Sequence, residues 1–315
     1  MDQIKESIFV FEKNKPSQVN EIKEHNVEFW FHNWRQNKNA KSRVYELMNQ
    51  SISDTLFDEN VRSHFTELDK EKFLIFLRGI NFNHGQDPED MVSLRMYFDG
   101  KKLITVTNRR MESLHKVYLS LQESDSFLKS SSDVFIEIIS QVLTRIEHYV
   151  DKMTQEIENI EDEFDEHGCI EQFVLHDLKR KASKMWRHLL PQQETLRKLS
   201  VNHYAWEQKP FKHHALSFYD FMCIQIEEIK LIRERCEILD KQIEAKTTEK
   251  INKNIYVISI ITVIFVPLSF VTGLFGINIG GMPGVDNTNA FMIFSLVTFA
   301  IVVIQVLILK FFKWF

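Results

Sequence analysis

The chain has 315 residues, 26% of them charged, and a formal net charge of -5. This modest acidic balance and the absence of a basic tract argue against a nucleic-acid partner. The mean hydropathy of -0.23 averages a polar body, which ends near Lys250, and a strongly apolar tail. Cys169, Cys223 and Cys236 are odd in number and far apart, which indicates a reducing compartment rather than a disulfide framework.

The first predicted unit, residues 1–130, is typical of a cytoplasmic α/β domain. Its opening residues lack the apolar core of a signal peptide, so we expect no cleaved leader. Asp99-Gly100 lies between two β-rich runs and predicts a tight hairpin. The predicted strands are Ser7–Glu12, Val27–His32, Met91–Phe98 and Lys101–Asn108, and the predicted helices are Lys41–Gln50 and Ser53–Phe65.

Residues 131–200 are predicted to form an antiparallel helical hairpin. Apolar residues recur at helical spacing over Asp133–Glu166, and Gly168 is a typical residue for ending a helix. The second helix is expected from about Ile170 to Leu199. Each helix has an apolar stripe, so the pair should bury these stripes against each other and against the domain that precedes them.

The two predicted helices carry opposite charge. The end of the first is rich in Glu and Asp, and the second has a basic stretch between Lys179 and Arg187. An antiparallel arrangement would let these faces neutralise each other on the protein surface. Alternatively the acidic tip, with Glu161 and Asp162 as candidate ligands, binds divalent cations, whose hard charge suits carboxylate oxygens. The residues alone leave both interpretations open.

A third helix is predicted to run without interruption from the polar body into the first apolar segment. Over Leu216–Phe275 the only proline is Pro267, and no glycine precedes Gly273. We assign residues 201–254 to a cytoplasmic stalk helix. A stalk with an apolar stripe needs partners to cover it, so we expect an oligomer.

Two apolar segments close the chain, and each is about 20 residues long, enough to cross a bilayer as a helix. We assign residues 255–275 to the first span, 276–290 to an external loop, 291–309 to the second span and 310–315 to a basic cytoplasmic tail. Lysines flank the outer ends of the two spans, whereas the loop holds no Lys or Arg. The positive-inside rule therefore predicts that both ends of the chain are cytoplasmic.

One face of the first span combines small, hydroxyl-bearing and apolar side chains. Steps of three or four residues place them on one side of a helix. Such a face either permits close helix packing or lines a water-filled pore with apolar constrictions. The candidate pore-lining residues are Ile255, Ile258, Thr262, Val266, Ser269 and Gly273.

A Gly-Ile-Asn sequence, Gly276, Ile277 and Asn278, directly follows the first span. The amide oxygen of Asn278 can accept hydrogen bonds from the water around a cation without carrying charge. Gly276 leaves the backbone free to turn. The tripeptide is a candidate selectivity motif at a pore mouth, although Gly and Asn are also common in ordinary turns.

Further candidate metal ligands are scattered along the chain. Imidazole suits Zn²⁺, so His213 and His214 near the start of the stalk are considered as ligands. Asp286 is the acidic residue of the external loop. Because neither span contains Asp, Glu or His, a proton-coupling group would have to lie in this loop or in the polar body. No nucleophile–base arrangement is recognisable, so we expect neither enzyme activity nor a cofactor.

The Gly-Ile-Asn motif after the first of two C-terminal spans resembles the signature of the CorA-type divalent metal ion transporters. Its continuation, Ile279–Gly284, is similar to the ZntB zinc-transporter branch, and so is the segment Arg78–Arg95 of the soluble part. The magnesium branch usually carries Tyr-Gly-Met-Asn, whereas this chain has Phe275 at the tyrosine position. The resemblance extends over the whole chain.

This resemblance implies a funnel-shaped homopentamer in which each chain has an α+β cytoplasmic domain, a long helical stalk and two C-terminal transmembrane helices. The first spans would line a central pore, and Asn278 would meet the hydrated ion at its outer mouth. The implied function is uptake of Zn²⁺ across the plasma (inner) membrane, with proton coupling left open. The implied partners are copies of the same chain, divalent metal ions and the lipid bilayer.

Two other functions stay open on the residues alone. One is a Mg²⁺, Co²⁺ or Ni²⁺ channel of the same architecture, because selectivity among hydrated ions is hard to derive from residue types. The other is a membrane-anchored sensor or scaffold whose spans only tether it. A scaffold has no need of Asn278, so replacing this residue separates a scaffold from a transporter.

Overall fold

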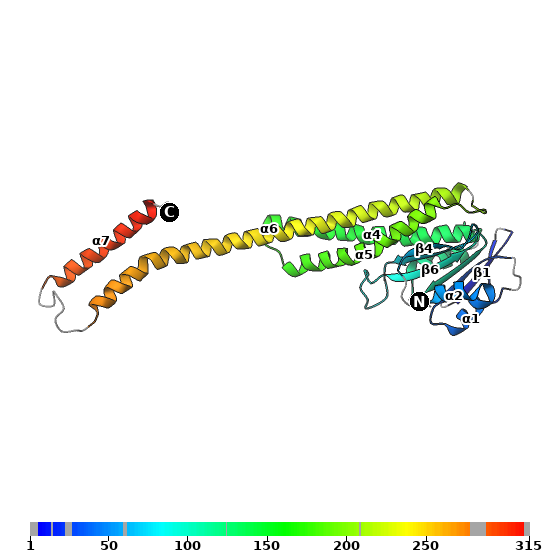
Figure 1. The fold of residues 1–315 in the computed structure, drawn as a ribbon, viewed down its shortest axis with the longest axis horizontal. Coiled ribbons are helices and arrows are strands. Elements are labelled where there is room, and N and C mark those ends of the chain that lie inside the picture. The colour runs from blue at the N-terminus through cyan, green and yellow to red at the C-terminus, as the bar shows by residue number, and fades with distance from the viewer. Residues whose placement is uncertain are drawn as a thin grey trace. The chain divides into compact units, whose positions relative to one another are not determined.

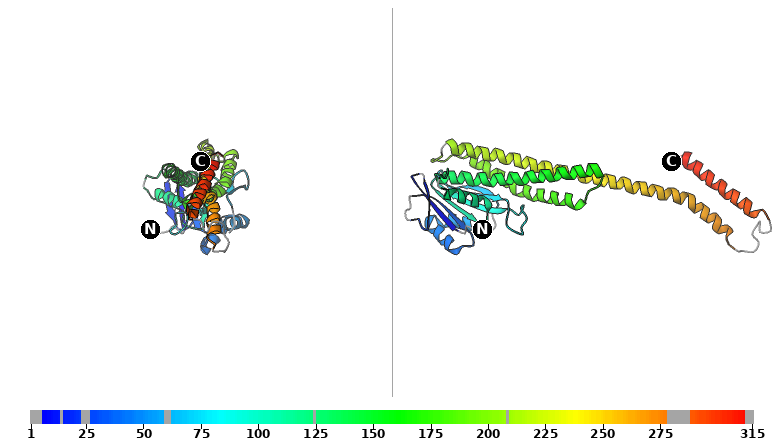
Figure 2. Two further views of the ribbon diagram at one scale, coloured as in Figure 1. Left: turned by 90° about the vertical axis from the view of Figure 1, so that its left-hand side faces the viewer. Right: turned by 180° about the vertical axis from the view of Figure 1, so that it is seen from behind.

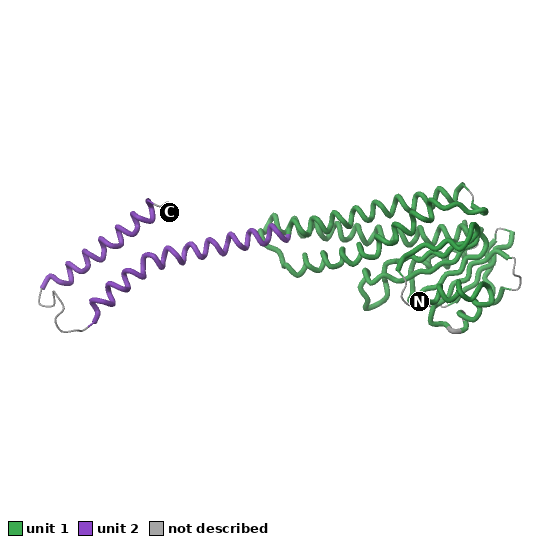
Figure 3. Tube along the Cα trace, in the orientation of Figure 1, with its two compact units in different colours: residues 1–239 green, residues 240–315 purple. Residues whose placement is uncertain are grey.

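The computed structural model describes residues 6–13, 15–22, 27–58, 62–123, 125–207, 209–277 and 288–311. It divides into two compact units, which we call the N-terminal unit, residues 1–239, and the C-terminal unit, residues 240–315 (Figure 3). The N-terminal unit contains a sheet and most of the helices. The C-terminal unit contains the second part of a long helix and one further helix (Figure 1).

A seven-stranded mixed sheet lies at the centre of the N-terminal unit, with strand order β2-β1-β3-β7-β6-β5-β4. Among the described strands, β3 and β7 pair in parallel and the other neighbours pair antiparallel. The strands are β1 (Glu6–Glu12), β2 (Lys15–Val19), β3 (Glu28–Trp34), β4 (His64–Glu67), β5 (Phe73–Gly79), β6 (Val92–Phe98) and β7 (Lys102–Thr107).

The predicted hairpin between β6 and β7 is confirmed. The Asp99 carboxylate accepts hydrogen bonds from the backbone N–H groups of Lys101 (3.0 Å) and Lys102 (2.7 Å), which closes the turn. Gly100 has a φ of +87°, which side-chain-bearing residues rarely adopt. The indole ring of Trp206 occupies the space that a Cβ atom at Gly100 would need. Glycine is therefore required here by the backbone conformation and by the packing.

Helices cover both faces of the sheet (Figures 1 and 2). On one face, Val44 and Leu56 of the first two helices join a buried cluster with Phe29. On the other face, Phe98 stacks on Phe135 with 5.0 Å between ring centroids. The helices are α1 (Lys38–Leu47), α2 (Gln50–Phe57), α3 (Glu112–Gln122), α4 (Ser131–His167), α5 (Gln172–Val201), α6 (Lys209–Phe275) and α7 (Ala290–Phe311).

Helix α4 begins and ends where its sequence provides caps. The Ser130 hydroxyl accepts a hydrogen bond from the backbone N–H of Asp133 (3.1 Å), as expected of an N-cap. At the other end Gly168 adopts φ of 69°, and its N–H donates to the carbonyl of Phe164 (2.8 Å). The helix predicted from the apolar spacing, with Gly168 as its stop, is thereby confirmed.

Helices α4, α5 and α6 lie side by side in the N-terminal unit (Figures 1 and 2). The Lys181 ammonium of α5 lies 3.3 Å from the Glu156 carboxylate of α4, so opposite charges do pair across these helices. The guanidinium of Arg233 on α6 lies 5.3 Å from the ring centroid of Trp186 on α5. These contacts join α6 to the helical hairpin that precedes it.

The helix predicted over Ser53–Phe65 is wrong in its second half. The structure ends α2 at Phe57 and pairs His64–Glu67 with β5 as the edge strand β4. The His64 ring packs edge-on against Phe76 with 4.3 Å between centroids. The edge strand β2 and helix α3 also have no predicted counterpart. Short edge strands are half polar, so local periodicity alone does not distinguish them from helix ends or loops.

The burial of His32 makes the stability of the N-terminal unit sensitive to pH. Its Nδ1 atom lies 3.0 Å from the Thr105 hydroxyl inside the sheet, and burial lowers the pKa of His32 to about 4. The unfolded chain titrates near the ordinary value of about 6.5 and binds the proton more tightly. Above about pH 6.5, His32 is neutral in both states and its burial does not reduce the free energy of unfolding. As the pH falls from 6.5 towards 4, the free energy of unfolding decreases by on the order of 3 kcal/mol.

We predict that His32→Gln makes the free energy of unfolding less dependent on pH between 7 and 4. Denaturant unfolding of the purified protein at several pH values, followed by tryptophan fluorescence, measures this slope. The pKa of His188 is also lowered, by burial and by Arg78 and Arg187, so part of the slope should persist. The exposed His148→Gln serves as the control. An identical slope for wild type and His32→Gln would contradict the prediction.

Candidate ion-conduction site

Helix α6 continues without a break for 67 residues and contains Pro267 near its C-terminal end. Helices α6 and α7 are both long and apolar enough to cross a membrane. In the C-terminal unit their apolar side chains are largely exposed, as Ile258 (62%) and Val266 (59%) illustrate. Soluble monomers rarely expose a contiguous apolar surface of this extent, so lipid or other protein chains must cover it.

Helix α7 packs against one side of α6 in this unit. The Gln305 side-chain amide donates a hydrogen bond to the carbonyl of Val263 (3.4 Å), and the Phe275 and Phe294 rings meet edge-on at 5.3 Å. The half-buried apolar residues of α6 on this side are Ile260, Ile264, Leu268 and Val271. Their helical positions are opposite to those of the predicted pore-lining face.

All six candidate pore-lining residues are exposed in the chain, and they lie on the side of α6 that α7 leaves uncovered. The Thr262 hydroxyl donates to the carbonyl of Ile258 (2.8 Å), so its proton is satisfied inside the helix while its oxygen can still accept. A Cβ atom on Gly273 would meet nothing within 4 Å in this chain. No contact within the described part of the chain therefore requires a small residue at Gly273.

The first two residues of the Gly-Ile-Asn motif come directly after the end of α6. The N–H of Gly276 donates to the carbonyl of Thr272 (2.9 Å), and a Cβ atom on Gly276 would lie 3.0 Å from that same oxygen. Ile277 is 48% exposed. Asn278, like Asp286 of the predicted external loop, lies outside the described residues.

The candidate metal ligands of the N-terminal unit do not form a cluster. The Glu161 carboxylate is bound by two guanidinium nitrogens of Arg235, and Asp162 is exposed nearby. His213 and His214 are exposed at the start of α6, with ring centroids 6.3 Å apart. Within the described residues, no group of three His, Cys, Asp or Glu side chains is arranged to hold a metal ion.

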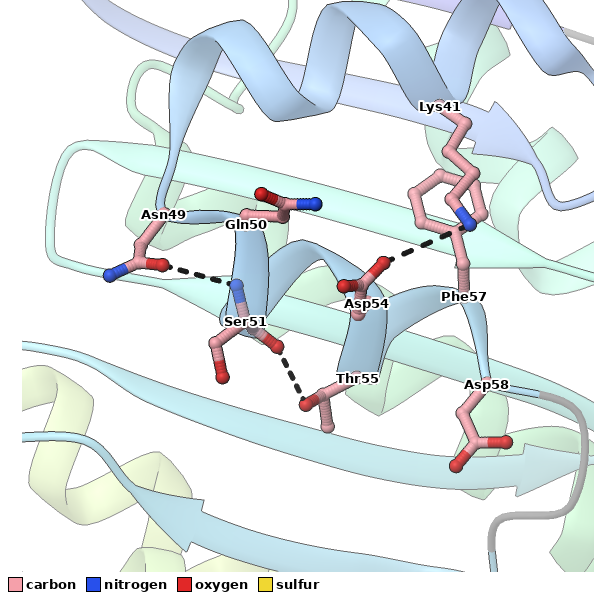
Figure 4. A pocket seen from close by; sticks show the side chains of 8 residues that line it. All are labelled: Lys41, Asn49, Gln50, Ser51, Asp54, Thr55, Phe57 and Asp58. Atoms are coloured by element: carbon pink, nitrogen blue, oxygen red, sulfur yellow. Dashed lines mark hydrogen bonds and ion pairs between the residues drawn. The ribbon is translucent and has the colours of Figure 1, made fainter.

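A pocket of about 830 Å³ lies beside α1 and α2 in the N-terminal unit (Figure 4). The Lys41 ammonium lies 3.9 Å from the Asp54 carboxylate, and the Asn49 side chain caps α2 by accepting from the N–H of Ser51 (3.1 Å). The Lys41–Asp54 ion pair joins α1 to α2, and the Asn49 cap lies at the start of α2. The pocket is lined by Lys41, Asn49, Gln50, Ser51, Asp54, Thr55, Phe57 and Asp58.

A protein-family model described as a CorA-like Mg²⁺ transporter protein matches residues 29–311. The chain belongs to this family. The matched region begins in β3 of the sheet and ends at the last residue of α7. Two relatives of this CorA-family chain are named as transporters rather than enzymes.

One of these relatives is the divalent cation transporter CmaX of Pseudomonas aeruginosa. It is 30% identical over 269 residues, which cover 85% of this chain and 81% of CmaX. The other is the zinc transport protein ZntB of Vibrio parahaemolyticus, which is 32% identical over 286 residues, covering 89% of this chain and 87% of ZntB. The two names agree on divalent cations and differ on whether zinc is specified.

Solved structures agree with the fold. The structure of full-length CmaX matches with a TM-score of 0.86 and 27% identity, covering 100% of this chain and 99% of CmaX. The CorA magnesium transporter of Methanocaldococcus jannaschii matches with a TM-score of 0.81, covering 98% of both chains, and at 16% identity it supports the fold alone. The predicted order of an α+β domain, a long helix and two C-terminal transmembrane helices is confirmed for this CorA-family chain.

The segment Arg78–Arg95, which resembles the ZntB branch, contains a buried carboxylate that the sequence did not predict. Glu89, 1% exposed, accepts a hydrogen bond from the Tyr149 hydroxyl of α4 (3.1 Å). Burial and this carboxylate raise the pKa of Tyr149. Lys184 of α5 lies 3.8 Å from Glu89 and 3.1 Å from Asp90. In this CorA-family chain the β5–β6 connection is therefore held to α4 and α5.

Proposed function

We propose that this chain transports divalent cations through a central pore formed by several copies, most simply a homopentamer, with Zn²⁺ as the preferred ion. The observation that carries the proposal is the uncovered face of α6, which lies opposite α7 and leads into the Gly-Ile-Asn motif. One pair of spans cannot enclose an aqueous path, whereas a ring of copies can. Membership of the CorA-like family and the transporter names of the relatives support this proposal.

In the proposed pore, the hydroxyl-bearing and the apolar residues on the uncovered face of α6 have different roles. Thr262 and Ser269 present hydroxyl oxygens to the water around a passing cation. Ile255, Ile258 and Val266 form apolar rings that close the path when water leaves them. Asn278 stands at the outer mouth, where an uncharged amide binds the ion's hydration shell and does not trap the ion as a carboxylate ring would.

We propose that both ends of the chain are cytoplasmic, in the plasma (inner) membrane. Lys246, Lys250 and Lys253 precede the first span, and Lys310 follows the second. Ions then enter from the outside and leave into the cytoplasm. Because the spans contain no Asp, Glu or His, proton coupling would have to use Asp286 or a group of the N-terminal unit.

A Mg²⁺, Co²⁺ or Ni²⁺ channel of the same architecture is the second candidate, and the Mg²⁺ in the family's description favours it. Uptake into proteoliposomes that enclose a zinc-sensitive dye separates the two. The zinc proposal expects Zn²⁺ entry that excess Mg²⁺ inhibits weakly, and proton coupling adds stimulation by an inward proton gradient. Strong inhibition by Mg²⁺ and indifference to pH would favour the channel.

The pore-lining face can be tested by cysteine accessibility. We predict that Thr262→Cys and Ser269→Cys react with a positively charged, water-soluble methanethiosulfonate and that Zn²⁺ slows both reactions. Val271→Cys, on the side that α7 covers, is the matched control and should react slowly. The full-length chain is used with Cys169 and Cys223 replaced by serine. Equal reaction rates at all three positions would contradict the assignment of this face to water.

A further inference from the structure

One side of α6 within the N-terminal unit is uncovered and has a regular composition. The buried side chains of α6, such as Met222, Ile229 and Cys236, point the other way. Acidic and aliphatic residues alternate on the uncovered side, and each type repeats every seven residues. This acidic α6 face consists of Asp220, Ile224, Glu227, Leu231, Glu234 and Ile238.

The aliphatic residues of this face are well exposed: Ile224 by 58%, Leu231 by 50% and Ile238 by 57%. A heptad of exposed aliphatic side chains on a helix is typical of a surface that packs against another helix. The acidic residues between them indicate that this other helix presents basic residues at matching positions.

Helix α5 carries such a surface on its uncovered side. This basic α5 face consists of Phe173, Arg180, Arg187, Leu190, Lys198 and Val201. Its apolar members are exposed, as Phe173 (78%) and Val201 (52%) show. Glu194 lies on the same side and is neutralised by Arg197, at 2.7 Å. The two faces therefore have opposite charge, and both carry exposed apolar groups.

The charged residues of the two faces also lie at matching positions along the helix axis, which we call their heights. Within one chain α5 and α6 are antiparallel, with Arg233 beside Trp186 and the Gln193 amide 3.1 Å from the Cys223 sulfur. Counting along both helices from these contacts places Asp220 at the height of Lys198. Rotation about an axis along the helices leaves heights unchanged, so the same correspondence holds between neighbouring copies in a ring.

The same count applies to the other charged residues. Glu227 lies within about one helical turn of Arg187 in height, and Glu234 within about one turn of Arg180. Arginine and glutamate side chains are long enough to span that offset. Within one chain, however, Glu234 lies 3.8 Å from Lys230, and Arg180 lies 2.8 Å from Asp177. The charge match between the two faces therefore rests on the pairs Asp220–Lys198 and Glu227–Arg187.

We propose that the acidic α6 face of one copy packs against the basic α5 face of the next copy. This inference rests on the homo-oligomer of the proposed function and adds which surfaces meet. Two different faces in contact give a head-to-tail interface, which forms a ring when the rotation between copies closes. Pairing two acidic α6 faces would instead set Asp220, Glu227 and Glu234 against their own counterparts, and such like-charge contacts are unfavourable.

Disulfide cross-linking of the full-length protein tests this pairing directly. Differently tagged chains with Asp220→Cys and Lys198→Cys, the pair at equal height, are co-expressed, with Cys169 and Cys223 replaced by serine, and then oxidised. We expect a disulfide between the two kinds of chain. One chain carrying both substitutions should give a ladder that ends at the size of the ring. The control pairs Lys198→Cys with Asp151→Cys, at an exposed position of α4, and should give no ladder.

Reversing the charges on the two faces and measuring assembly gives an independent test. Asp220→Lys with Glu227→Lys, or Arg187→Glu with Lys198→Glu, should each raise the concentration at which the oligomer dissociates by about tenfold or more. Combining all four substitutions should restore assembly. Asp151→Lys with Lys152→Glu on α4 is the control and should leave assembly unchanged.

The outcomes separate this inference from the proposed function. An oligomeric protein that shows neither the cross-link nor the charge-exchange rescue would overturn the pairing and leave the transport proposal standing. A protein that stays monomeric in detergent and in lipid would overturn both. Cross-linked rings that fail to pass ions would support the pairing and contradict the transport proposal.

Discussion

Replacing Asn278 with alanine is expected to reduce Zn²⁺ entry into proteoliposomes to the level of protein-free liposomes. In the proposed function a ring of Asn278 amides replaces part of the ion's outer water contacts at the pore mouth. Alanine offers neither an acceptor nor a donor, so the first step of entry loses its polar partner. Uptake is measured with an internal zinc-sensitive dye at equal protein density.

The matched control for Asn278→Ala is Asn287→Ala, which removes an asparagine of the same loop from outside the Gly-Ile-Asn motif. Both variants must elute as oligomers of wild-type size, so that a folding defect is not mistaken for a conduction defect. Wild-type uptake by Asn278→Ala would contradict the role of the motif. Equal loss in both variants would indicate a general effect of altering the loop.

Gly100→Ala is expected to lower the free energy of unfolding by about 2–5 kcal/mol. Alanine at φ of +87° costs on the order of 1–2 kcal/mol in backbone energy. In addition, the new methyl group collides with Trp206, which packs against Phe98 at 4.9 Å between centroids, and such overpacking costs about 1–3 kcal/mol. The midpoint of denaturant unfolding of the purified protein measures the loss.

Gly85→Ala is the matched control for Gly100→Ala. Gly85 also has a positive φ, of 73°, but a Cβ atom there meets nothing within 4 Å. Gly85→Ala should therefore lose only the stability that the backbone conformation costs. The difference in free energy of unfolding between the two variants isolates the contact with Trp206. Equal destabilisation by both substitutions would show that Trp206 yields to the methyl group at no cost.

Long, strongly periodic elements of this chain could be predicted from the sequence. Helix α4 buries residues at steps of three and four from Val134 to Phe164, and its stop at Gly168 follows from the backbone freedom of glycine. The β6–β7 hairpin follows from Asp99-Gly100. Edge strands are harder to predict, because half of their residues face solvent. Strand β2 begins with Lys15-Pro16, and the sequence of β4 resembles the end of a helix.

Some features of the candidate site could likewise be predicted from the sequence, and others could not. Periodicity identified the face of α6 that contains Thr262 and Ser269, and it left packing and pore lining as alternatives. Only the structure shows that α7 takes the opposite side of α6. The pairing of Glu161 with Arg235 was beyond sequence reasoning, because the two residues are 74 positions apart and belong to different helices. The roles of Asn278 and Asp286 remain predictions from the sequence.

The most direct test of the central claim is whether the purified wild-type chain carries a divalent cation across a lipid bilayer. Oligomeric protein is reconstituted into liposomes that contain a zinc-sensitive dye, Zn²⁺ is added outside, and the fluorescence is compared with that of protein-free liposomes. A dye response that scales with the amount of reconstituted protein is the predicted result. The absence of entry of Zn²⁺, and of Mg²⁺, Co²⁺ and Ni²⁺ with matching dyes, by folded oligomer would contradict it and favour a membrane-anchored scaffold.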